Sequence, residues 1–392
     1  MFAISSKGGK TKVANNDAER SFNNFDFLRL FAAFCVMVGH STGHLGIPFL
    51  WVGEGGYWWF YDGVPIFFVI SGMLVYRSYE NCIENGRPIT DFYRNRFLRI
   101  SPAIYAYIIA TTVILLTIGA ISFNVLNKIP FWGWVVSNLI LVPVYFPDFM
   151  RHIGVGVLNG SLWTIPAEFS FYLVIPVIFL LEKKLGIKKT LTILTILGLF
   201  SSTVIWYFNL LGKEFEPLWF KFFKVSLFSG LVYFTLGIFW LKFWKYSHQG
   251  RYLFIVSVIA YSLGTWVFQI SKYFGPTWDL VRVIPLSYVV VWFGYNGPKL
   301  FSKITTKIGD LSYGVYIWHM VVINVFLFFN LPLKLSWIPS SIFQLLVFAI
   351  TFAIAKLSWT FIEKPCLRMK NFSSRTLTET KVQNIKSTAI RM

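Results

Sequence analysis

The sequence predicts an all-α polytopic membrane protein with ten transmembrane helices, one short re-entrant or interfacial element, and both termini in the cytoplasm. The chain has 392 residues, of which 56% are hydrophobic, 20% are aromatic and only 14% are charged. Soluble domains usually carry about 25% charged residues. A chain of this length could form two or three soluble domains, but it has too few charged side chains to cover their surfaces.

Ten apolar stretches are long enough to cross a bilayer, because a hydrocarbon core of about 30 Å needs roughly 20 helical residues. In chain order, the predicted spans are 25–46, 58–76, 100–121, 163–181, 190–210, 222–241, 252–270, 280–298, 310–329 and 339–361. An eleventh apolar stretch, 132–146, is shorter and contains Asn138 and Pro143.

The distribution of Lys and Arg decides whether the short stretch crosses, because short cytoplasmic loops collect these residues. With the amino terminus inside and 132–146 not crossing, 26 of the 36 Lys and Arg residues fall on the cytoplasmic side and seven fall outside. If 132–146 crossed, the basic segment 182–189 and every later basic loop would move outside. We therefore predict that 132–146 re-enters the membrane or lies along its surface, as segments do where protein or a cavity covers them.

This topology explains the formal net charge of +19. The basic segments orient the chain and contact anionic lipids of the inner leaflet, so membrane lipids rather than nucleic acid are the expected partners. We divide the chain into a cytoplasmic tail (1–24), a membrane domain (25–362) and a second cytoplasmic tail (363–392). The three cysteines are expected to remain reduced thiols, because their number and placement predict no disulfide framework.

Ionisable residues inside predicted spans are costly and therefore point to function. Arg29 and His40 are eleven residues apart, which is about three helical turns, so they share one face with about 16 Å between their levels. Taken separately, Arg29 is also explained as a positive-inside anchor and His40 as an interhelical hydrogen-bonding group. His44 lies one turn beyond His40, but no carboxylate or cysteine accompanies the pair, so we predict no metal site.

Arginines are concentrated just before the span 100–121, at Arg94, Arg96 and Arg99. Arg96 and Arg99 are three residues apart and share a face of any helix formed there. The guanidinium fork binds phosphate groups bidentately. These residues are candidates for phosphate recognition, and ordinary cytoplasmic-loop charge is the alternative.

Four further residues complete the set of candidates. Glu168 lies near the outer end of its span, where it could orient an imidazole or accept a hydrogen bond from substrate, or simply face water at the interface. Asp62 and His319 are polar residues within spans, and a structural hydrogen bond is the simplest role for His319. Trp163 is more typical of an interfacial aromatic belt than of a sugar-binding platform.

Six motifs occur in order along the chain: NFDFLRLFAAFCVMVGHS (24–41), DGVPIFFVISGMLVY (62–76), FYRNRFLRISP (92–102), SLWTIPAEFSFYLVIP (161–176), LSYGVYIWHMVVI (311–323) and FIEKPCLR (361–368). Together they resemble the integral-membrane acyltransferase family 3, bacterial O-acetyltransferases of lipopolysaccharide, exopolysaccharide and related envelope glycans. The resemblance covers roughly residues 22–371. It departs from the family at Pro65, where an acidic residue is frequent, and Asp62 lies three residues earlier.

The resemblance implies transfer of an acyl group, most simply acetyl, from cytoplasmic acyl-CoA to a hydroxyl of an envelope or exported polysaccharide or glycolipid. It implies His40 as general base, with Arg29 stabilising the thioester and Glu168 orienting the imidazole or the sugar. It implies that Arg96 and Arg99 hold the phosphates of CoA.

The implied setting is the bacterial inner membrane, which the protein would cross several times. Acetyl-CoA or another acyl-CoA would be a donor substrate, and no cofactor would be bound permanently. No hydrolase-like domain follows the last predicted span. We therefore expect the membrane domain or a separate protein of envelope-glycan biosynthesis to handle the acceptor, with a homo-oligomer as a further option.

Two other classes of protein fit parts of the sequence. A transporter or flippase of a lipid-linked sugar would also be polytopic, aromatic and basic on the inside, but would act without acyl-CoA. A non-catalytic membrane scaffold would have little reason to bear the insertion cost of intramembrane His and Glu residues.

Overall fold

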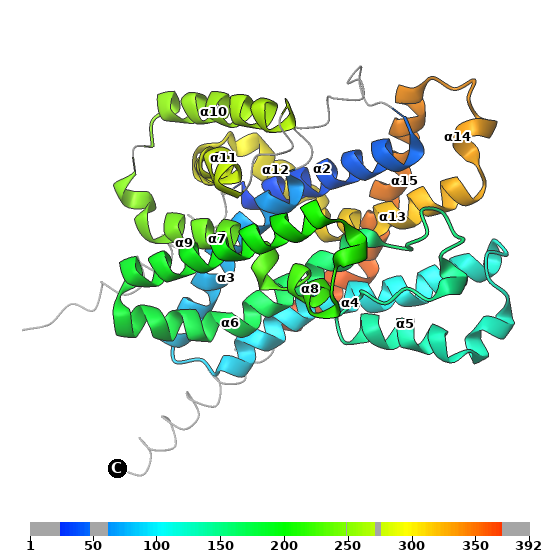
Figure 1. The fold of residues 1–392 in the computed structure, drawn as a ribbon, viewed down its shortest axis with the longest axis horizontal. Helices are drawn as coiled ribbons and strands as arrows, with labels where there is room; N and C mark the ends of the chain where they lie inside the picture. Colours follow the sequence, from blue (N-terminus) through cyan, green and yellow to red (C-terminus); the bar gives the residue numbers. More distant parts are fainter. Residues whose placement is uncertain (1–23, 48–61, 248, 271–275, 371–392) are drawn as a thin grey trace, which may run out of the picture.

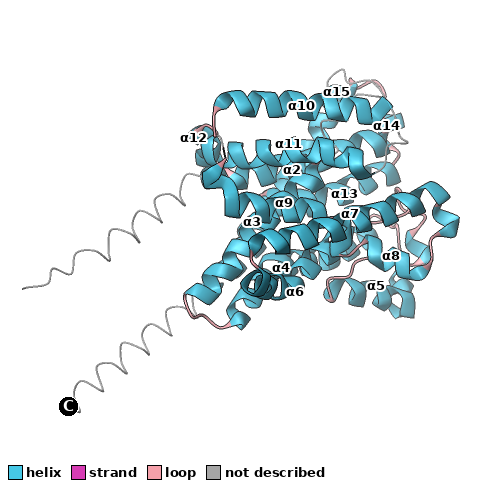
Figure 2. Ribbon diagram, turned by 60° about the vertical axis from the view of Figure 1, so that its left-hand side comes forward, coloured by secondary structure: helices cyan, strands magenta, loops and turns pink. Residues whose placement is uncertain are grey.

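The computed structural model describes residues 24–47, 62–247, 249–270 and 276–370, and all regular elements within these ranges are helices (Figure 2). The predicted all-α class is therefore confirmed. The longer helices are α2 (Phe25–Leu45), α3 (Gly63–Glu84), α4 (Ile89–Thr117), α5 (Ile129–Leu139), α6 (Thr164–Leu185), α7 (Ile187–Leu211), α9 (Leu231–Phe243), α10 (Arg251–Ile270), α11 (Pro276–Asn296), α12 (Lys299–Ile308), α13 (Ser312–Phe328) and α15 (Ser340–Ser358).

Shorter helices connect or extend these elements. They are η2 (Phe123–Asn127), η3 (Asp148–Met150), η4 (Gly160–Trp163), η5 (Lys213–Phe215), α8 (Leu218–Lys224), η6 (Leu227–Ser229), η7 (Trp244–Tyr246), α14 (Leu331–Lys334), the π-helix η8 (Trp359–Glu363) and α16 (Lys364–Arg368). The amino-terminal tail and the second tail beyond residue 370 lie outside the described residues. Helix α16 directly follows η8, so the first residues of the predicted tail 363–392 are helical.

Several helices are long and apolar enough to cross a membrane. Five described segments meet this requirement: α2, α4, α7, α6 with the preceding η4, and α15 with η8 and α16. A sixth does so if α12 and α13, which meet at 66°, form one bent span. The chain is therefore a multi-pass membrane protein by helix length and hydropathy, and ten spans remain a prediction.

The outward faces of several helices are apolar. Large hydrophobic side chains are exposed on α6, α7, α10 and α15, including Leu180 (65%), Phe200 (65%), Leu263 (57%) and Leu345 (59%). Soluble monomers rarely expose continuous apolar surface on this scale. A lipid environment is the setting in which such faces are stable.

Helix α4 begins at Ile89, so the arginines before the predicted span 100–121 lie on the same helix as that span. One predicted span next to the site was wrong. The predicted continuous span 222–241 is instead α8, η6 and α9. The chain breaks before Gly230, where a Cβ atom would overlap the ring of Phe68, so this close approach to α3 requires glycine.

Helices α3 and α9 pack closely through facing glycines. A Cβ atom on Gly72 would collide with the backbone of Phe234, and one on Gly237 would collide with the backbone of Val69. Small residues at crossing points allow helix backbones to approach in membranes. Helix α3 of this pair lines one wall of the cavity described below.

The helices around the site run in two directions. In Figure 1, α2, α4 and α13 run toward the end of the molecule that carries α14, whereas α6 runs the opposite way. Helices α2 and α13 contact each other, as do α3 and α6. Arg99, in the third turn of α4, meets Asp310, which lies just before α13.

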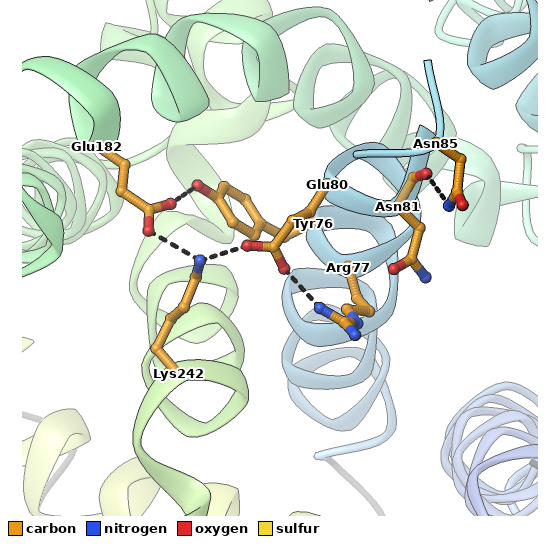
Figure 3. A network of polar contacts seen from close by, with 7 residues as sticks. All are labelled: Tyr76, Arg77, Glu80, Asn81, Asn85, Glu182 and Lys242. Atoms are coloured by element: carbon orange, nitrogen blue, oxygen red, sulfur yellow. Dashed lines mark hydrogen bonds and ion pairs between the residues drawn. The ribbon is translucent and has the colours of Figure 1, made fainter. Parts of the chain in front are cut away.

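A polar network joins α3, α6 and α9 just beyond the predicted spans (Figure 3). The Nζ atom of Lys242 lies 2.7 Å from a carboxylate oxygen of Glu80 and 2.8 Å from one of Glu182. Tyr76 donates a hydrogen bond to Glu182, and Arg77 pairs with Glu80 at 3.0 Å. Burial opposes charge on Glu80 and Lys242, but their hydrogen bonds outweigh it, lowering the pKa of Glu80 and raising that of Lys242. Sequence analysis did not identify this network.

Candidate functional site

A cavity lies between five helices. Its lining comes from α2 (Arg29), α3 (Val64, Phe67, Phe68, Ser71, Val75), α4 (Arg96, Arg99, Ile100), α6 (Thr164, Ile165, Glu168, Tyr172) and α13 (Ser312, Tyr313, Tyr316). The lining residues of α3 span eleven positions, which corresponds to about 16 Å along the helix axis. Four candidates from the sequence, Arg29, Arg96, Arg99 and Glu168, therefore line one elongated cavity.

Two of the three arginines in the cavity are neutralised by carboxylates. Arg29 pairs with Asp26 at 3.3 Å, one turn earlier on α2. Arg99 pairs at 2.5 Å with Asp310, whose other oxygen accepts a 2.5 Å hydrogen bond from the Ser312 hydroxyl. Asp310 thus connects the start of α13 to α4. The sequence analysis did not single out Asp310, although its position at the start of a predicted span was a usable signal.

Arg96 differs from its neighbours because aromatic rings hold it. Its guanidinium lies 5.6 Å from the ring centroid of Phe92 and 5.7 Å from that of Tyr172. Among the described residues it forms neither an ion pair nor a hydrogen bond, and its Nε atom is buried without a partner. Cation–π contacts leave the N–H groups of an arginine available. In the part of the chain that the structure describes, no carboxylate pairs with Arg96, so its N–H groups are available to an anion.

Glu168 and Tyr172 form a pair one turn apart on α6. The hydroxyl of Tyr172 donates a hydrogen bond to Glu168. The Tyr172 ring also contacts Arg96, so Glu168 connects to the arginines through this tyrosine rather than by direct pairing. The structure does not bring Glu168 into hydrogen-bonding contact with His40.

One face of α13 leads from the arginines toward the histidines. Tyr313, Tyr316 and His319 recur every three residues, and the first two line the cavity. The Tyr313 hydroxyl donates to the carbonyl of Ile100 at 3.0 Å, and the Tyr316 hydroxyl donates to the carbonyl of Ser161 at 2.7 Å. These bonds fix α13 against α4 and against the segment preceding α6.

His40 lies on α2 beyond the cavity lining and contacts two other histidines. Its Nδ1 atom is 2.8 Å from Nε2 of His319. The His44 ring centroid is 5.6 Å away, with the two rings inclined by 25°. His319 is fully buried and His40 is partly exposed. The two candidates of α2 therefore occupy different levels: Arg29 lies in the cavity, and His40 lies one turn beyond the level of Tyr316.

Two candidates take positions outside the cavity lining. Asp62 is buried at the start of α3, where it pairs with Arg282 and accepts a 2.5 Å hydrogen bond from Tyr261. This arrangement joins α3 to α10 and α11. Trp163 ends η4, directly before α6, and packs partly buried against the core.

A further cation lies near the arginines but was not identified from the sequence. Lys370 follows α16, next to Met369, whose carbonyl accepts a 2.9 Å hydrogen bond from Arg94. Burial lowers the pKa of Lys370 to about 7, and the charges of Arg99, Arg96 and Arg29 act in the same direction. A lysine with this pKa gains its full charge when an anion binds beside it.

The described residues contain no group of three or more His, Cys, Asp or Glu side chains arranged to hold a metal ion. Cys35, Cys82 and Cys366 are all free thiols.

Comparison with known proteins places this geometry in a family. The family model for the acyltransferase domain of acyltransferase family 3 matches residues 22–359. Nodulation protein 10 of Rhizobium leguminosarum bv. viciae is 27% identical over 91% of this chain and 96% of its own length. The O-acetyl transferase of Shigella phage Sf6 is 27% identical over 87% of this chain and 95% of its own length.

A longer relative shares the same region. The peptidoglycan O-acetyltransferase OatA of Listeria monocytogenes is 24% identical over 87% of this chain, which spans 55% of that protein. No solved structure matches the chain. The family model covers the cavity and both histidines, and the chain therefore belongs to acyltransferase family 3, whose members matched here include O-acetyltransferases of cell-envelope polymers.

Proposed function

We propose that the protein transfers an acyl group, most simply acetyl, from acyl-CoA on the cytoplasmic side to a hydroxyl of an envelope or exported glycan. The proposal includes ten transmembrane spans, cytoplasmic termini and residence in the bacterial inner membrane. The observation that carries it is one cavity with three arginines at one end and, along the same face of α13, a route toward His40.

The arginine end suits the polyanionic part of CoA. Arg96 has free N–H groups inside the cavity, and guanidinium groups bind phosphates with charge-assisted hydrogen bonds. The cavity walls beyond the arginines are mostly apolar and aromatic, as Phe67, Phe68 and Ile165 illustrate. Such walls fit the extended thiol arm, while the hydroxyls of Thr164 and Tyr316 face its far end.

The charge distribution supports the sidedness. The cavity arginines lie in the first turns of α2 and in the amino-terminal half of α4, next to the predicted cytoplasmic segments 1–24 and 77–99, which belong to the Lys- and Arg-rich set. Acyl-CoA would therefore enter from the cytoplasm. The acceptor hydroxyl would approach from the opposite side, at the level of His40.

In the proposed reaction, His40 accepts the proton of the acceptor hydroxyl as its oxygen attacks the thioester carbonyl. The C–S bond then breaks, and the departing thiolate takes the proton from the imidazolium, so that CoA–SH leaves and neutral His40 is restored. A positioned general base typically contributes on the order of 10² to 10⁴ in rate.

The test is acetyl transfer by purified protein in proteoliposomes, supplied with radiolabelled acetyl-CoA and membrane glycolipid from the host. We expect transfer of label that depends on His40, together with the loss of one acetyl ester per acceptor unit in surface glycan of a deletion strain. Label transfer without dependence on His40 would remove it as the base, and no transfer from acetyl-CoA would reject the donor.

The transporter alternative is not favoured, because the named relatives include O-acetyltransferases. It also makes a separate prediction, which is sugar flux across proteoliposomes without acyl-CoA.

A further inference from the structure

The contact between His40 and His319 is made through ring nitrogens. The rings are parallel to within 9°, their centroids are 5.1 Å apart, and the nearest nitrogens are 2.8 Å apart. A face-to-face stack would separate the nitrogens further, so the rings meet edge to edge in a hydrogen bond. Which nitrogen donates depends on the second contact made by His319.

The second contact settles the tautomers. Nδ1 of His319 lies 3.0 Å from the carbonyl oxygen of Val315, one turn earlier on α13. A carbonyl only accepts hydrogen bonds, so Nδ1 of His319 carries a proton. His319 is fully buried and, in the described part of the chain, hydrogen-bonds to no carboxylate, so burial keeps it neutral with an unprotonated Nε2. His40 must therefore donate through Nδ1, and its own Nε2 keeps the lone pair.

We propose that His319 is a positioning residue for His40, holding it in the Nδ1-protonated tautomer so that Nε2 is the catalytic base. This inference rests on the proposed function and specifies the atom that performs it. A free imidazole in water favours the opposite tautomer, with the proton on Nε2. The carbonyl of Val315 and the ring of His319 reverse that preference.

His319 orients the base His40 as the carboxylate of a catalytic triad orients its histidine, but the charge of the orienting group differs. A carboxylate in the third position both fixes the tautomer and stabilises the imidazolium. Neutral His319 fixes the tautomer and supplies no negative charge. The proton accepted by Nε2 from the acceptor hydroxyl is therefore passed readily to the departing thiolate of CoA.

The surrounding contacts keep His319 in place. Asn159 donates a 2.8 Å hydrogen bond to the carbonyl of Ile317, and Asn324 donates to the carbonyl of Leu158 at 2.9 Å. The ring of Tyr316 meets that of His319 at 61°. A functional group held by packed helices and a second set of hydrogen bonds retains its geometry through the reaction.

The test reads the tautomer directly. Protein labelled with ¹⁵N only in histidine is reconstituted in nanodiscs, and solid-state NMR distinguishes protonated from unprotonated ring nitrogens. The chain has five histidines, and loss of one signal set in His40→Ala identifies His40. We expect wild-type His40 to have a protonated Nδ1 and an unprotonated Nε2, and His319→Leu to move the proton to Nε2. Wild-type protein with the proton on Nε2, or His319→Leu with an unchanged tautomer, would overturn the proposal.

Kinetics provide the second measurement. His319→Leu should lower kcat roughly 10- to 1,000-fold, within the range known for general-base effects, while leaving KM for acetyl-CoA unchanged, because His319 does not line the cavity. His319→Gln should recover much of the rate, since its amide oxygen can accept a hydrogen bond from the Nδ1–H group of His40. His44→Gln is the matched control and should keep the wild-type tautomer of His40.

The two measurements separate the hypotheses. If His40→Ala transfers acetyl normally, the proposed base is wrong whatever tautomer the NMR reports. If His40→Ala is inactive but His319→Leu and wild type share one tautomer and one kcat, only the role of His319 is rejected. A retained thermal shift with acetyl-CoA confirms that each variant is folded.

Discussion

The Nδ1 atom of His40 lies 2.8 Å from the Nε2 atom of His319, which is 279 residues further along the chain. This contact joins the first described helix to α13 just beyond the end of the cavity. It places the proposed base where a cytoplasmic donor and an external acceptor would meet. The predictions below test the chemistry on either side of this contact.

Removing the imidazole of His40 should abolish transfer without affecting donor binding. We expect His40→Ala to lower the rate of acetyl transfer on the order of 10² to 10⁴-fold. The measurement is radiolabel transfer in proteoliposomes, with His44→Gln as the control because its exposed ring stacks on His40 but makes no hydrogen bond in the described structure. A fall of similar size in both variants would show that the histidine cluster acts as packing.

Replacing Arg96 should weaken donor binding and leave stability almost unchanged. Hydrogen bonds to charged groups contribute about 1.5–3 kcal/mol, so Arg96→Gln should raise the Kd for CoA roughly 10- to 150-fold. Isothermal titration with CoA in nanodiscs measures this change. Arg87→Gln, an exposed arginine just before α4, should bind CoA like wild type, and equal affinities of all three proteins would exclude Arg96 from the donor site.

Replacing Arg99 should weaken CoA binding, because the cavity loses a cation. It should also lower the stability of the protein, because Asp310 would lose its partner. Breaking a buried pair by removing one partner costs about 3–5 kcal/mol, and the residual exposure of these side chains, 23% and 11%, places the cost at the lower end. The apparent Tm of Arg99→Gln should fall, and the double variant Arg99→Gln/Asp310→Asn should recover part of the loss. A double variant less stable than the single one would contradict this account.

Binding of CoA should depend on pH through Lys370. The pKa of this lysine is lowered to about 7, so without ligand it is mostly neutral above pH 7 and charged below. A bound phosphate favours the charged form, and binding therefore takes up a proton. The Kd should rise by up to about tenfold per pH unit between pH 7 and 8.5, a range in which a phosphate monoester, whose second pKa is about 6, stays dianionic.

The lysine variants isolate this effect. Lys370→Arg stays charged over the whole range and should bind CoA with a flattened pH dependence. Lys370→Met should bind more weakly at pH 6.5 and show no dependence. An unchanged pH slope in Lys370→Arg would assign the titration to another group.

The Lys242 network should contribute stability rather than chemistry. Lys242→Met leaves Glu182 without a cation and leaves Glu80 with only the half-exposed Arg77. We expect a clear fall in apparent Tm, with the cost of a broken buried pair near 3 kcal/mol. Because the pKa of Glu80 is lowered and that of Lys242 is raised, the network should contribute fully between about pH 5 and 10.

Two comparisons check the network. The triple variant Glu80→Gln/Glu182→Gln/Lys242→Met should melt closer to wild type than Lys242→Met alone, since both carboxylates are neutralised and the one charge that remains in the network, Arg77, is half exposed. The KM for acetyl-CoA should be the same in all folded variants, because none of these residues lines the cavity. Unchanged melting of Lys242→Met would show that the network is not stabilising.

Local relationships were predictable from the sequence. Arg29 and His40 lie on one helix, and Arg96 and Arg99 face one cavity, because helical periodicity determines which nearby residues share a face. The break before Gly230 had a local signal, because 222–241 contains Lys224, Ser226 and the dipeptide Ser229–Gly230, which marks turns. The close approach of Gly230 to Phe68 of α3 is a contact between distant segments, which the sequence does not give.

The sequence by itself determined the helical class, the membrane character and which ionisable residues lie within or beside the apolar segments, because composition and apolar length are local properties. Only the tertiary structure decided the partners of those residues. Arg99 pairs with Asp310, Asp62 pairs with Arg282, and His40 is hydrogen-bonded to His319, and the residues of each pair are more than 200 positions apart in the sequence. Helical periodicity determines which face of a helix a residue occupies, but not which other helix packs on that face. The packing of α13 on α2 brings His319 to His40 and so sets the position of the proton on the His40 ring.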